Sequence, residues 1–294
     1  MAEPPHLPPD ELGLPPVVPP SGKYIAQLFI VPGLIVAGAV SVLLFFSWMA
    51  SGPRTPEGFL AGLRNINPEI RWRAASDLAQ VLMRDPELAA NANFGLDLAV
   101  QLKDALPAMR KDTPPASPET AAARGQFMMQ RSEVRYLAAC LGHMSTPVGA
   151  KVLCDVATQV ISPDPKTDAL LRRQAVWALG EMGHNRKRFT SLSQEKQDQV
   201  LAELTRIGAG AGDREEWARS AEESLRGKSS GGVIAALAKC AASNDPFVRK
   251  EAALALSFWE GSAEENILAN EALMRLTRDD GHGTVIEITK EDEI

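Results

Sequence analysis

Residues 227–231 read Gly-Lys-Ser-Ser-Gly, a stretch that matches parts of two enzyme motifs. The Gly-x-Ser-x-Gly spacing occurs in the nucleophile elbow, where a serine at a sharp strand-to-helix turn attacks an acyl group. The Gly-Lys-Ser triplet ends a phosphate-binding loop, which also needs a glycine five positions before the triplet. Glu222 occupies that position, and the residues before Gly227 have the pattern of a helix rather than of a strand. We therefore expect a joint between helices here, and we predict no catalytic residue.

Metal ligands are the second chemistry to consider, because the chain holds four histidines and three cysteines. Cys140 and His143 could offer two ligands from one face of a predicted helix, whereas a structural zinc site takes four. No HExxH or CxxC pattern supplies the other two. We expect no metal and no cofactor, and we expect the thiols to be small buried side chains in a reducing compartment. The three cysteines are Cys140, Cys154 and Cys240.

Four arginines recur at one place in a repeated pattern, after an apolar residue and before small residues at helical spacing. They are Arg71, Arg135, Arg172 and Arg249. One guanidinium carries five donors, so it can hold several carbonyl groups and a carboxylate at once, or it can face a partner as part of a basic ladder. Asp168 and Asp245 stand close to two of these arginines in the sequence and are the natural carboxylate partners.

Arg186, Lys187 and Arg188 form a basic run outside this pattern, in a predicted insertion at residues 183–193. Such a run could contact lipid headgroups, an acidic protein segment or RNA. A charge run in a loop is more often simply solvated, and the acidic chain as a whole favours that interpretation. We retain the three residues as candidate partner contacts.

The elements that would position these residues are pairs of helices. First helices are predicted near residues 68–83, 132–143, 168–182, 213–225 and 245–259. Second helices are predicted near 87–106, 147–161, 194–207, 232–242 and 264–277, with turn residues between the members of each pair. Small residues recur on the first helices where two helices would approach closely, which is typical of stacked helical repeats.

The repeated pattern Asp/Asn-Pro-x-Val/Ile-Arg-x-x-Ala-Ala-x-x-Leu resembles the first helix of a HEAT repeat of the bacterial, PBS-lyase-like (bilin-lyase-like) type. Complete copies begin at Asn67 and Asp245, and partial copies begin at Ser132 and Asp168. A fifth copy from Asp213 has alanine in place of the arginine. The resemblance implies an all-α fold, an α-solenoid of about five HEAT-like helix pairs over residues 51–280. It also implies that the repeat arginines are structural. We expect a protein partner on the concave face, because such a surface buries a large area without a pocket.

Residues 23–50 are predicted to form a single transmembrane helix, because no charged residue occurs between Lys23 and Arg54 and the run exceeds the length of a span. Tyr24 and Trp48 would lie roughly 36 Å apart, one at each membrane interface. A cleaved signal peptide is the competing interpretation. The long acidic segment before the run, and Trp48 at the −3 place before a cut after Ala50, favour the anchor.

Charge indicates where the rest of the chain would lie. More arginines follow the apolar run than basic residues precede it, which favours repeats in the cytoplasm and an anchor in the plasma (inner) membrane. The net charge of −6 and the pI near 5.4 disfavour nucleic-acid binding. The proline-rich residues 1–22 and the insertion at 107–124 are expected to be disordered, and residues 281–294 are expected to form a flexible acidic tail. Alternatively, residues 284–289 could add a strand to the sheet edge of a partner.

These observations predict a non-catalytic membrane-anchored scaffold or adaptor that binds another protein, since helical solenoids offer extended surfaces rather than reaction centres. Two alternatives remain open from the sequence. One is an accessory factor that holds a prosthetic group, as the bilin-lyase resemblance suggests. The other is a structural subunit of a large membrane complex.

Overall fold

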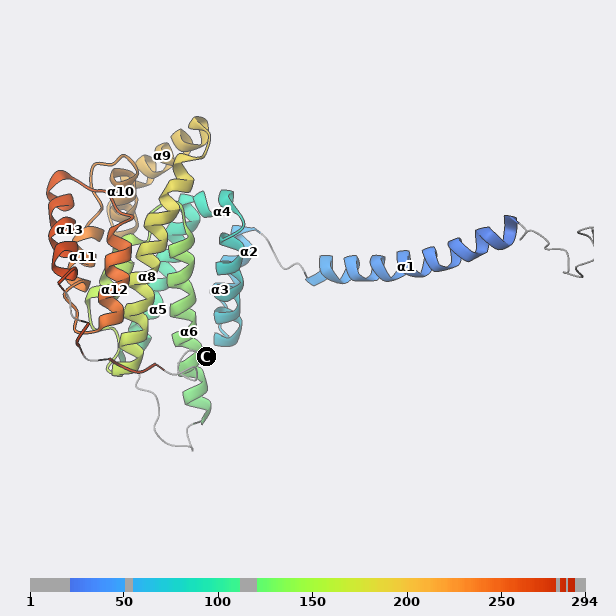
Figure 1. Ribbon diagram of the computed structural model, residues 1–294, viewed down its shortest axis with the longest axis horizontal. Helices are drawn as coiled ribbons and strands as arrows, with labels where there is room; N and C mark the ends of the chain where they lie inside the picture. Colours follow the sequence, from blue (N-terminus) through green and yellow to red (C-terminus); the bar gives the residue numbers. More distant parts are fainter. Residues whose placement is uncertain (1–21, 51–54, 112–120, 279–280, 284, 289–294) are drawn as a thin grey trace, which may run out of the picture. The chain divides into compact units, whose positions relative to one another are not determined.

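The computed structural model describes residues 22–50, 55–111, 121–278, 281–283 and 285–288 (Figure 1). All the regular elements in these residues are α-helices, as the sequence predicts, and no strand occurs among them. The chain divides into two compact units, residues 1–54 and residues 55–294. The residues predicted to form a disordered tail, 1–22, lie outside the described part except for Gly22, which begins the first helix.

Helix α1, Gly22–Ala50, belongs to the first unit and confirms the apolar helix predicted at residues 23–50. Its stretch Ala26–Phe46 is 21 residues long, is apolar and has no buried residue. Length and composition therefore suffice for crossing a membrane, although a signal sequence near an N-terminus meets the same description. Tyr24 and Trp48 lie near the two ends of this helix.

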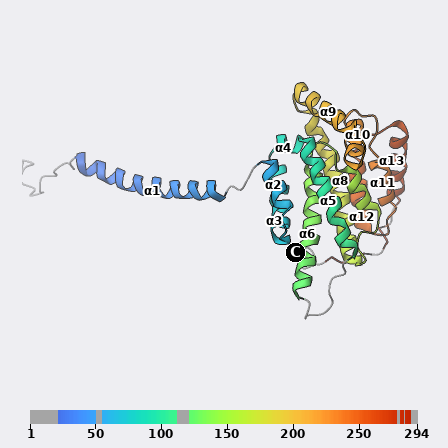
Figure 2. The ribbon, with the colours of Figure 1, turned by 180° about the vertical axis from the view of Figure 1, so that it is seen from behind.

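The second unit consists of two rows of helices. In the first row each helix packs against the next, and the members lie side by side in Figure 1: α3 (Pro68–Leu82), α6 (Ala121–His143), α8 (Pro165–Thr190) and α12 (Pro246–Leu256). The second row is seen from behind in Figure 2: α5 (Ala92–Lys111), α7 (Ala150–Thr158), α11 (Val233–Cys240) and α13 (Ala263–Leu276). Four further helices join these rows: α2 (Pro56–Leu63), α4 (Pro86–Ala90), α9 (Gln194–Gly208) and α10 (Asp213–Leu225).

Five of these helices begin in the same way, with a polar cap followed by proline. The cap side chain accepts a hydrogen bond from a backbone N–H of the first turn, and proline needs no partner for the N–H that it lacks. The caps are Thr55, Asn67, Asp85, Asp164 and Asp245. Because Asp164 is the cap of α8, that helix starts before Asp168, which the repeat pattern had marked as its beginning.

Small residues bring the first-row helices together, as the repeat pattern predicts. The alanines three or four positions after the repeat arginines are buried on all four helices: Ala75, Ala138, Ala175 and Ala252. Gly142 of α6 lies against the backbone of Ala178 of α8, and Gly180 of α8 lies against Ala255 of α12. Helix backbones can approach this closely only where no larger side chain intervenes.

The fifth predicted copy does not join the first row, because α8 packs directly against α12. Helix α10, which begins at Asp213, instead packs against α9 and reaches α5 of the second row. Ion pairs between Lys103 and Asp213 and between Asp97 and Arg214 link α10 to α5. Of the about five helix pairs that the sequence predicts, this one therefore lies outside the first row. The position that should hold the repeat arginine is a buried alanine, Ala218.

Parts of two predicted insertions are helical. Helix α5 runs through Pro107 to Lys111, and α6 already begins at Ala121, so that only residues 112–120 of the insertion at 107–124 lie outside the described residues. Helix α8 continues to Thr190 through most of the predicted insertion at 183–193. Both helices have buried side chains beyond their predicted ends: Met109 in α5, and Asn185 and Phe189 in α8.

Part of the predicted C-terminal tail, 281–294, contacts the helices. Arg249 Nη2 donates to the His282 carbonyl oxygen at 2.7 Å, and Arg173 Nη2 donates to the Ile286 carbonyl oxygen at 3.0 Å. Residues 281–283 and 285–288 therefore lie against the row formed by α8 and α12. The part of the tail from 289 to 294 lies outside the described residues.

Candidate functional site

The repeat arginines make contacts within the fold. Arg71 Nε lies 2.9 and 2.8 Å from the two carboxylate oxygens of Glu133, so that α3 is tied to α6. Arg71 Nη1 also donates to the carbonyl oxygens of Asn65 and Ile66, at 3.1 and 3.3 Å. One guanidinium thus closes the α2–α3 turn and bridges two first-row helices.

Arg172 and Asp168 pair as the sequence predicts, with Nη2 2.9 Å from the carboxylate. The other oxygen of Asp168 accepts hydrogen bonds from the backbone N–H groups of Ile161 and Ser162, at 2.7 and 3.3 Å. The carboxylate therefore fixes the α7–α8 connection. Arg135 lies half-buried on α6.

Asp245 pairs with a different arginine from the one expected. Arg173 Nε lies 2.8 Å from Asp245 Oδ2, and this ion pair joins α8 to α12. Arg249 donates instead to the carbonyl oxygens of Ser243, at 3.0 Å, and Asn244, at 3.3 Å. Sequence reasoning missed Arg173 because it stands one position after the repeat arginine, outside the pattern.

Glu133 is the buried carboxylate of this network. Burial raises its pKa, and the hydrogen bond and the positive charge of Arg71 act in the opposite direction. Its side chain is only 8% exposed, against 21% for Arg71, so neither charge is fully solvated. Glu133 therefore depends on Arg71 for the stability of its charged form.

The basic run 186–188 lies on the last turns of α8, not in a loop. Arg186 Nη2 donates to the Ser224 carbonyl oxygen at 2.7 Å, and its guanidinium lies 5.1 Å from the ring centre of Trp259. Burial lowers the pKa of Arg186. Arg186 of α8 therefore contacts both α10 and Trp259. Lys187 and Arg188 are exposed.

The stretch at 227–231, which resembles two enzyme motifs, forms hydrogen bonds with the first turn of helix α13. Ser230 Oγ donates to Glu265 at 2.6 Å, and Glu265 forms a capping box with Ser262 at the start of that helix. Burial acts to raise the pKa of Glu265, but hydrogen bonds from these serines outweigh it and the net pKa is lowered. Helix α10 precedes the stretch. The geometry is that of a joint between helices, as expected.

The other chemistry-bearing residues are separated. His143 packs edge-on against Trp177, with ring centres 5.7 Å apart, and burial lowers the pKa of His143. Cys140 points instead toward α3 and donates to the Ala75 carbonyl oxygen at 3.3 Å. No group of three or more histidine, cysteine or acidic residues suited to a metal ion occurs within the described ranges.

The cysteine environment leads to a first prediction, that none of the three thiols reacts with a disulfide reagent in the folded protein. All three are buried, and burial raises the pKa of Cys154 to about 12 and that of Cys240 to about 11, and raises that of Cys140 further. Only the thiolate reacts. Labelling with Ellman's reagent should be negligible until denaturant is added, when three thiols should react. Rapid labelling of one thiol in the native protein would contradict the buried positions.

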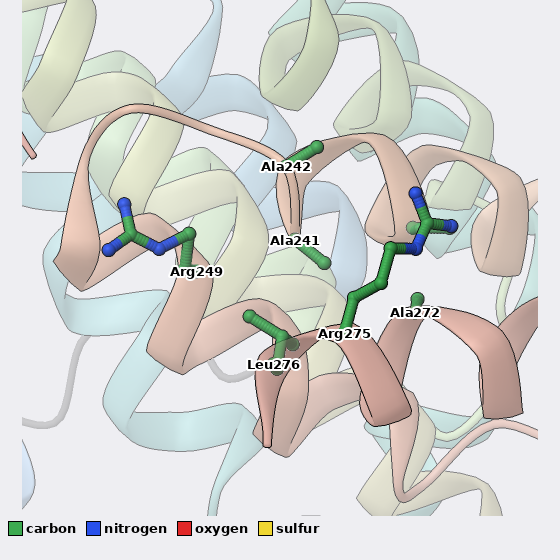
Figure 3. Close-up of a pocket in the computed structure, with 7 residues that line it drawn as sticks. Ala241, Ala242, Arg249, Ala272, Arg275 and Leu276 are labelled. Atoms are coloured by element: carbon green, nitrogen blue, oxygen red, sulfur yellow. The ribbon is translucent and has the colours of Figure 1, made fainter. Parts of the chain in front are cut away.

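A small cavity of about 220 Å³ lies between α11, α12 and α13 (Figure 3). Figure 3 shows Arg249 and Arg275 on either side of Ala241 and Ala242. Alanine side chains and Leu276 form most of the lining. Since Arg249 already donates to carbonyl groups, this cavity offers a ligand mainly apolar contacts.

The larger open cleft lies between the α2–α3 turn, α5 and α6, and is called the docking cleft here. Its volume is about 620 Å³, and its lining includes Arg64, Ile66, Gln101, Asp104, Gln130 and Glu133. Ile66 is 95% exposed, although it is a large apolar residue. Among the described residues, the side chains of Arg64, Gln101, Asp104 and Gln130 take part in no hydrogen bond or ion pair.

Sequence reasoning did not find the docking cleft, because its walls come from three elements separated along the chain. The local signal was an isoleucine in a polar turn, Arg64-Asn65-Ile66-Asn67. The cleft can offer one cation, one anion, two amides and an apolar contact to a ligand. Comparisons of the chain with protein-family models, with curated proteins and with solved structures find no match.

Proposed function

We propose that this protein is a membrane-anchored, non-catalytic scaffold that binds a segment of another protein at the docking cleft. The two rows of helices are interpreted as a HEAT-like solenoid of four pairs, with α9 and α10 as an inserted hairpin. The observation that carries the proposal is a contrast between two sets of polar groups. The repeat arginines Arg71 and Arg172 form ion pairs inside the fold, whereas four polar side chains of the cleft take part in no hydrogen bond or ion pair within the described part of the chain.

The chemistry of the docking cleft suits a polypeptide better than a single small ion. Arg64 can take a carboxylate, Asp104 can take a basic side chain, and Gln101 and Gln130 can pair with main-chain amides. A protein interface typically combines such a polar rim with an apolar anchor, and the exposed side chain of Ile66 can supply the anchor.

The anchor in this proposal is α1, crossing the plasma (inner) membrane with the repeats on the cytoplasmic side. Its apolar stretch of 21 residues and the arginines that follow it support this arrangement. A tether of this kind raises the local concentration of the scaffold near membrane targets.

The anchor is tested by alkaline extraction of membranes that contain the full chain. We expect the protein to stay in the membrane pellet with its N-terminal segment intact by mass spectrometry, and a variant lacking residues 1–50 to be released. A mature protein that starts near residue 51 and is washed out would instead identify α1 as a cleaved signal sequence.

Partner binding is tested by affinity purification of the full chain from membranes in mild detergent, followed by identification of the proteins recovered. Arg64→Glu should reduce recovery of the specific partner about ten-fold, as expected for loss of one ionic contact at an interface centre. Arg84→Glu makes the same charge change at an exposed site outside the cleft and should leave recovery unchanged. Equal recovery with both variants would contradict binding at the docking cleft.

A second candidate function is supported by the cleft volume, which falls within the range of small-molecule sites. In that case the protein would hold a prosthetic group for an enzyme, as the resemblance to bilin-lyase-like repeats implies. A visible absorption band that copurifies with the protein and is lost with Arg64→Glu would favour this function over the scaffold.

A further inference from the structure

The C-terminal segment, residues 281–283 and 285–288, lies against the turn that precedes α12 and against Arg173 of α8. Two arginines hold it by its main chain: Arg249 donates to the carbonyl oxygen of His282, and Arg173 donates to that of Ile286. Hydrogen bonds to carbonyl oxygens recognise an extended backbone rather than particular side chains. The segment is therefore held in the way that many proteins hold a bound peptide.

Gly283 fixes the register of this contact. A Cβ atom at this position would collide with the carbonyl oxygen of Asn244 and would lie 3.1 Å from Arg249 Nη1. The main chain thus rests directly on the α11–α12 turn, and only glycine allows that approach.

The side chain of Ile286 lines a cavity beside the segment. This cavity measures about 500 Å³ and is lined by Val248, Thr158, Cys240 and Asp245, among others. Ile286 and Ile288 are half-buried, whereas Val285 and Glu287 are exposed. The close approach at Gly283 and the placement of Ile286 in the cavity, three positions later, are therefore the two contacts from which we argue recognition.

Charge adds a third element of recognition. Basic side chains outnumber acidic ones around the segment. The basic residues are Arg172, Arg173, Lys239 and Arg249, and the acidic ones are Asp168 and Asp245. The segment itself carries Glu287, and the sequence continues with Glu291, Asp292 and Glu293. An acidic extended peptide is the ligand that this surface complements.

We propose that the groove formed by Arg173, Arg249, Asn244 and the cavity under Ile286 binds an extended acidic segment of a partner protein, with glycine followed three residues later by a branched apolar residue. The chain's own residues 281–288 are the competing occupant and must leave when the partner binds. The inference rests on the proposed scaffold function, since it adds a second contact for a protein partner, at a site separate from the docking cleft.

A fluorescent peptide with the sequence of residues 281–294 tests the groove, with anisotropy as the readout. The chain truncated after Asp280 should bind this peptide at least about ten-fold more tightly than the full chain, both in detergent micelles. Equal affinity for the two chains, or no binding to the truncated chain, would overturn the proposal.

Variants of the peptide keep the test independent of protein folding. The Gly283→Val peptide should lose about ten-fold or more in affinity for the truncated chain, because its side chain meets the Asn244 carbonyl. The Val285→Ala peptide changes an exposed residue and should bind as well as the parent. Identical binding of all three peptides would show a non-specific ionic contact and would overturn the assigned register.

The two proposals fail separately. If the truncated chain binds no peptide while the full chain still recovers a partner that is lost with Arg64→Glu, only the groove is refuted. If the groove behaves as expected and Arg64→Glu recovers the same partner as the wild type, the docking cleft is refuted and the groove stands.

Discussion

Replacing Arg71 with methionine should lower the free energy of unfolding by about 3 kcal/mol at neutral pH, because it leaves the carboxylate of Glu133 buried without a counter-ion. Methionine keeps much of the apolar stem of the arginine, so the loss reports mainly on the charge and its hydrogen bonds. Urea unfolding followed by circular dichroism measures it, with the full chain held in detergent.

The loss should depend on pH in a definite direction. The folded-state pKa of Glu133 is already raised by burial, and removal of Arg71 raises it further, since the only effects that lower it come from that residue. A carboxyl group whose pKa is higher in the folded state than in the unfolded state costs no stability while it is protonated in both states, below the unfolded-state pKa. As the pH rises through the folded-state pKa, the group must ionise in the folded protein, and stability is lost. The destabilisation of Arg71→Met should therefore be largest at neutral pH and shrink in mild acid.

A double variant is the control for this prediction. Arg71→Met combined with Glu133→Leu replaces the whole pair by apolar groups and should recover most of the lost stability, because a buried ion pair can often be exchanged in this way. A loss that is independent of pH, or single-variant losses that simply add in the double variant, would show that the two residues are not coupled.

Gly142→Leu should destabilise the second unit by about 3 kcal/mol, through overpacking between α6 and α8. A Cβ atom at Gly142 would lie 3.0 Å from Cα and 3.1 Å from the carbonyl oxygen of Ala178. Both are backbone atoms, which cannot rotate away as a flexible side chain can. The two first-row helices must separate to admit the leucine, and the contacts around Ala138 and Ala175 are then weakened.

Gly125→Ala is the matched control on the same helix. No atom lies within 4 Å of the added Cβ, so the substitution should gain about 0.5–1 kcal/mol from the higher helix propensity of alanine. Thermal unfolding of both variants measures the contrast. If both substitutions changed stability in the same direction, the close approach of α6 and α8 would not be the controlling feature.

The sequence predicts most of the helices and the way in which they meet. Periodicity places α3, α7, α11, α12 and α13 within a few residues of their observed bounds, and the small residues after the repeat arginines are the ones buried between first-row helices. This succeeds because both signals are local: apolar spacing defines one face of a helix, and proline with a polar cap defines its start.

The failures have a common physical cause, since they concern contacts between residues far apart in sequence. Helix α8 continues past residue 182 because Asn185 and Phe189 are buried by distant parts of the chain, which a local pattern of charged residues does not reveal. The ion pair of Arg173 with Asp245 spans 72 positions. The docking cleft likewise exists only after α2, α5 and α6 have packed.

The scaffold proposal is tested most directly by photo-crosslinking from the docking cleft in living cells. A benzophenone amino acid at Ile66, which lies in the cleft, should join the full chain to one specific protein, and Arg64→Glu in the same chain should abolish that product. The same probe at Met83, which is exposed but outside the cleft, should give no such product. Equal crosslinking from both positions, or none from Ile66 while the purified partner remains bound, would contradict the account.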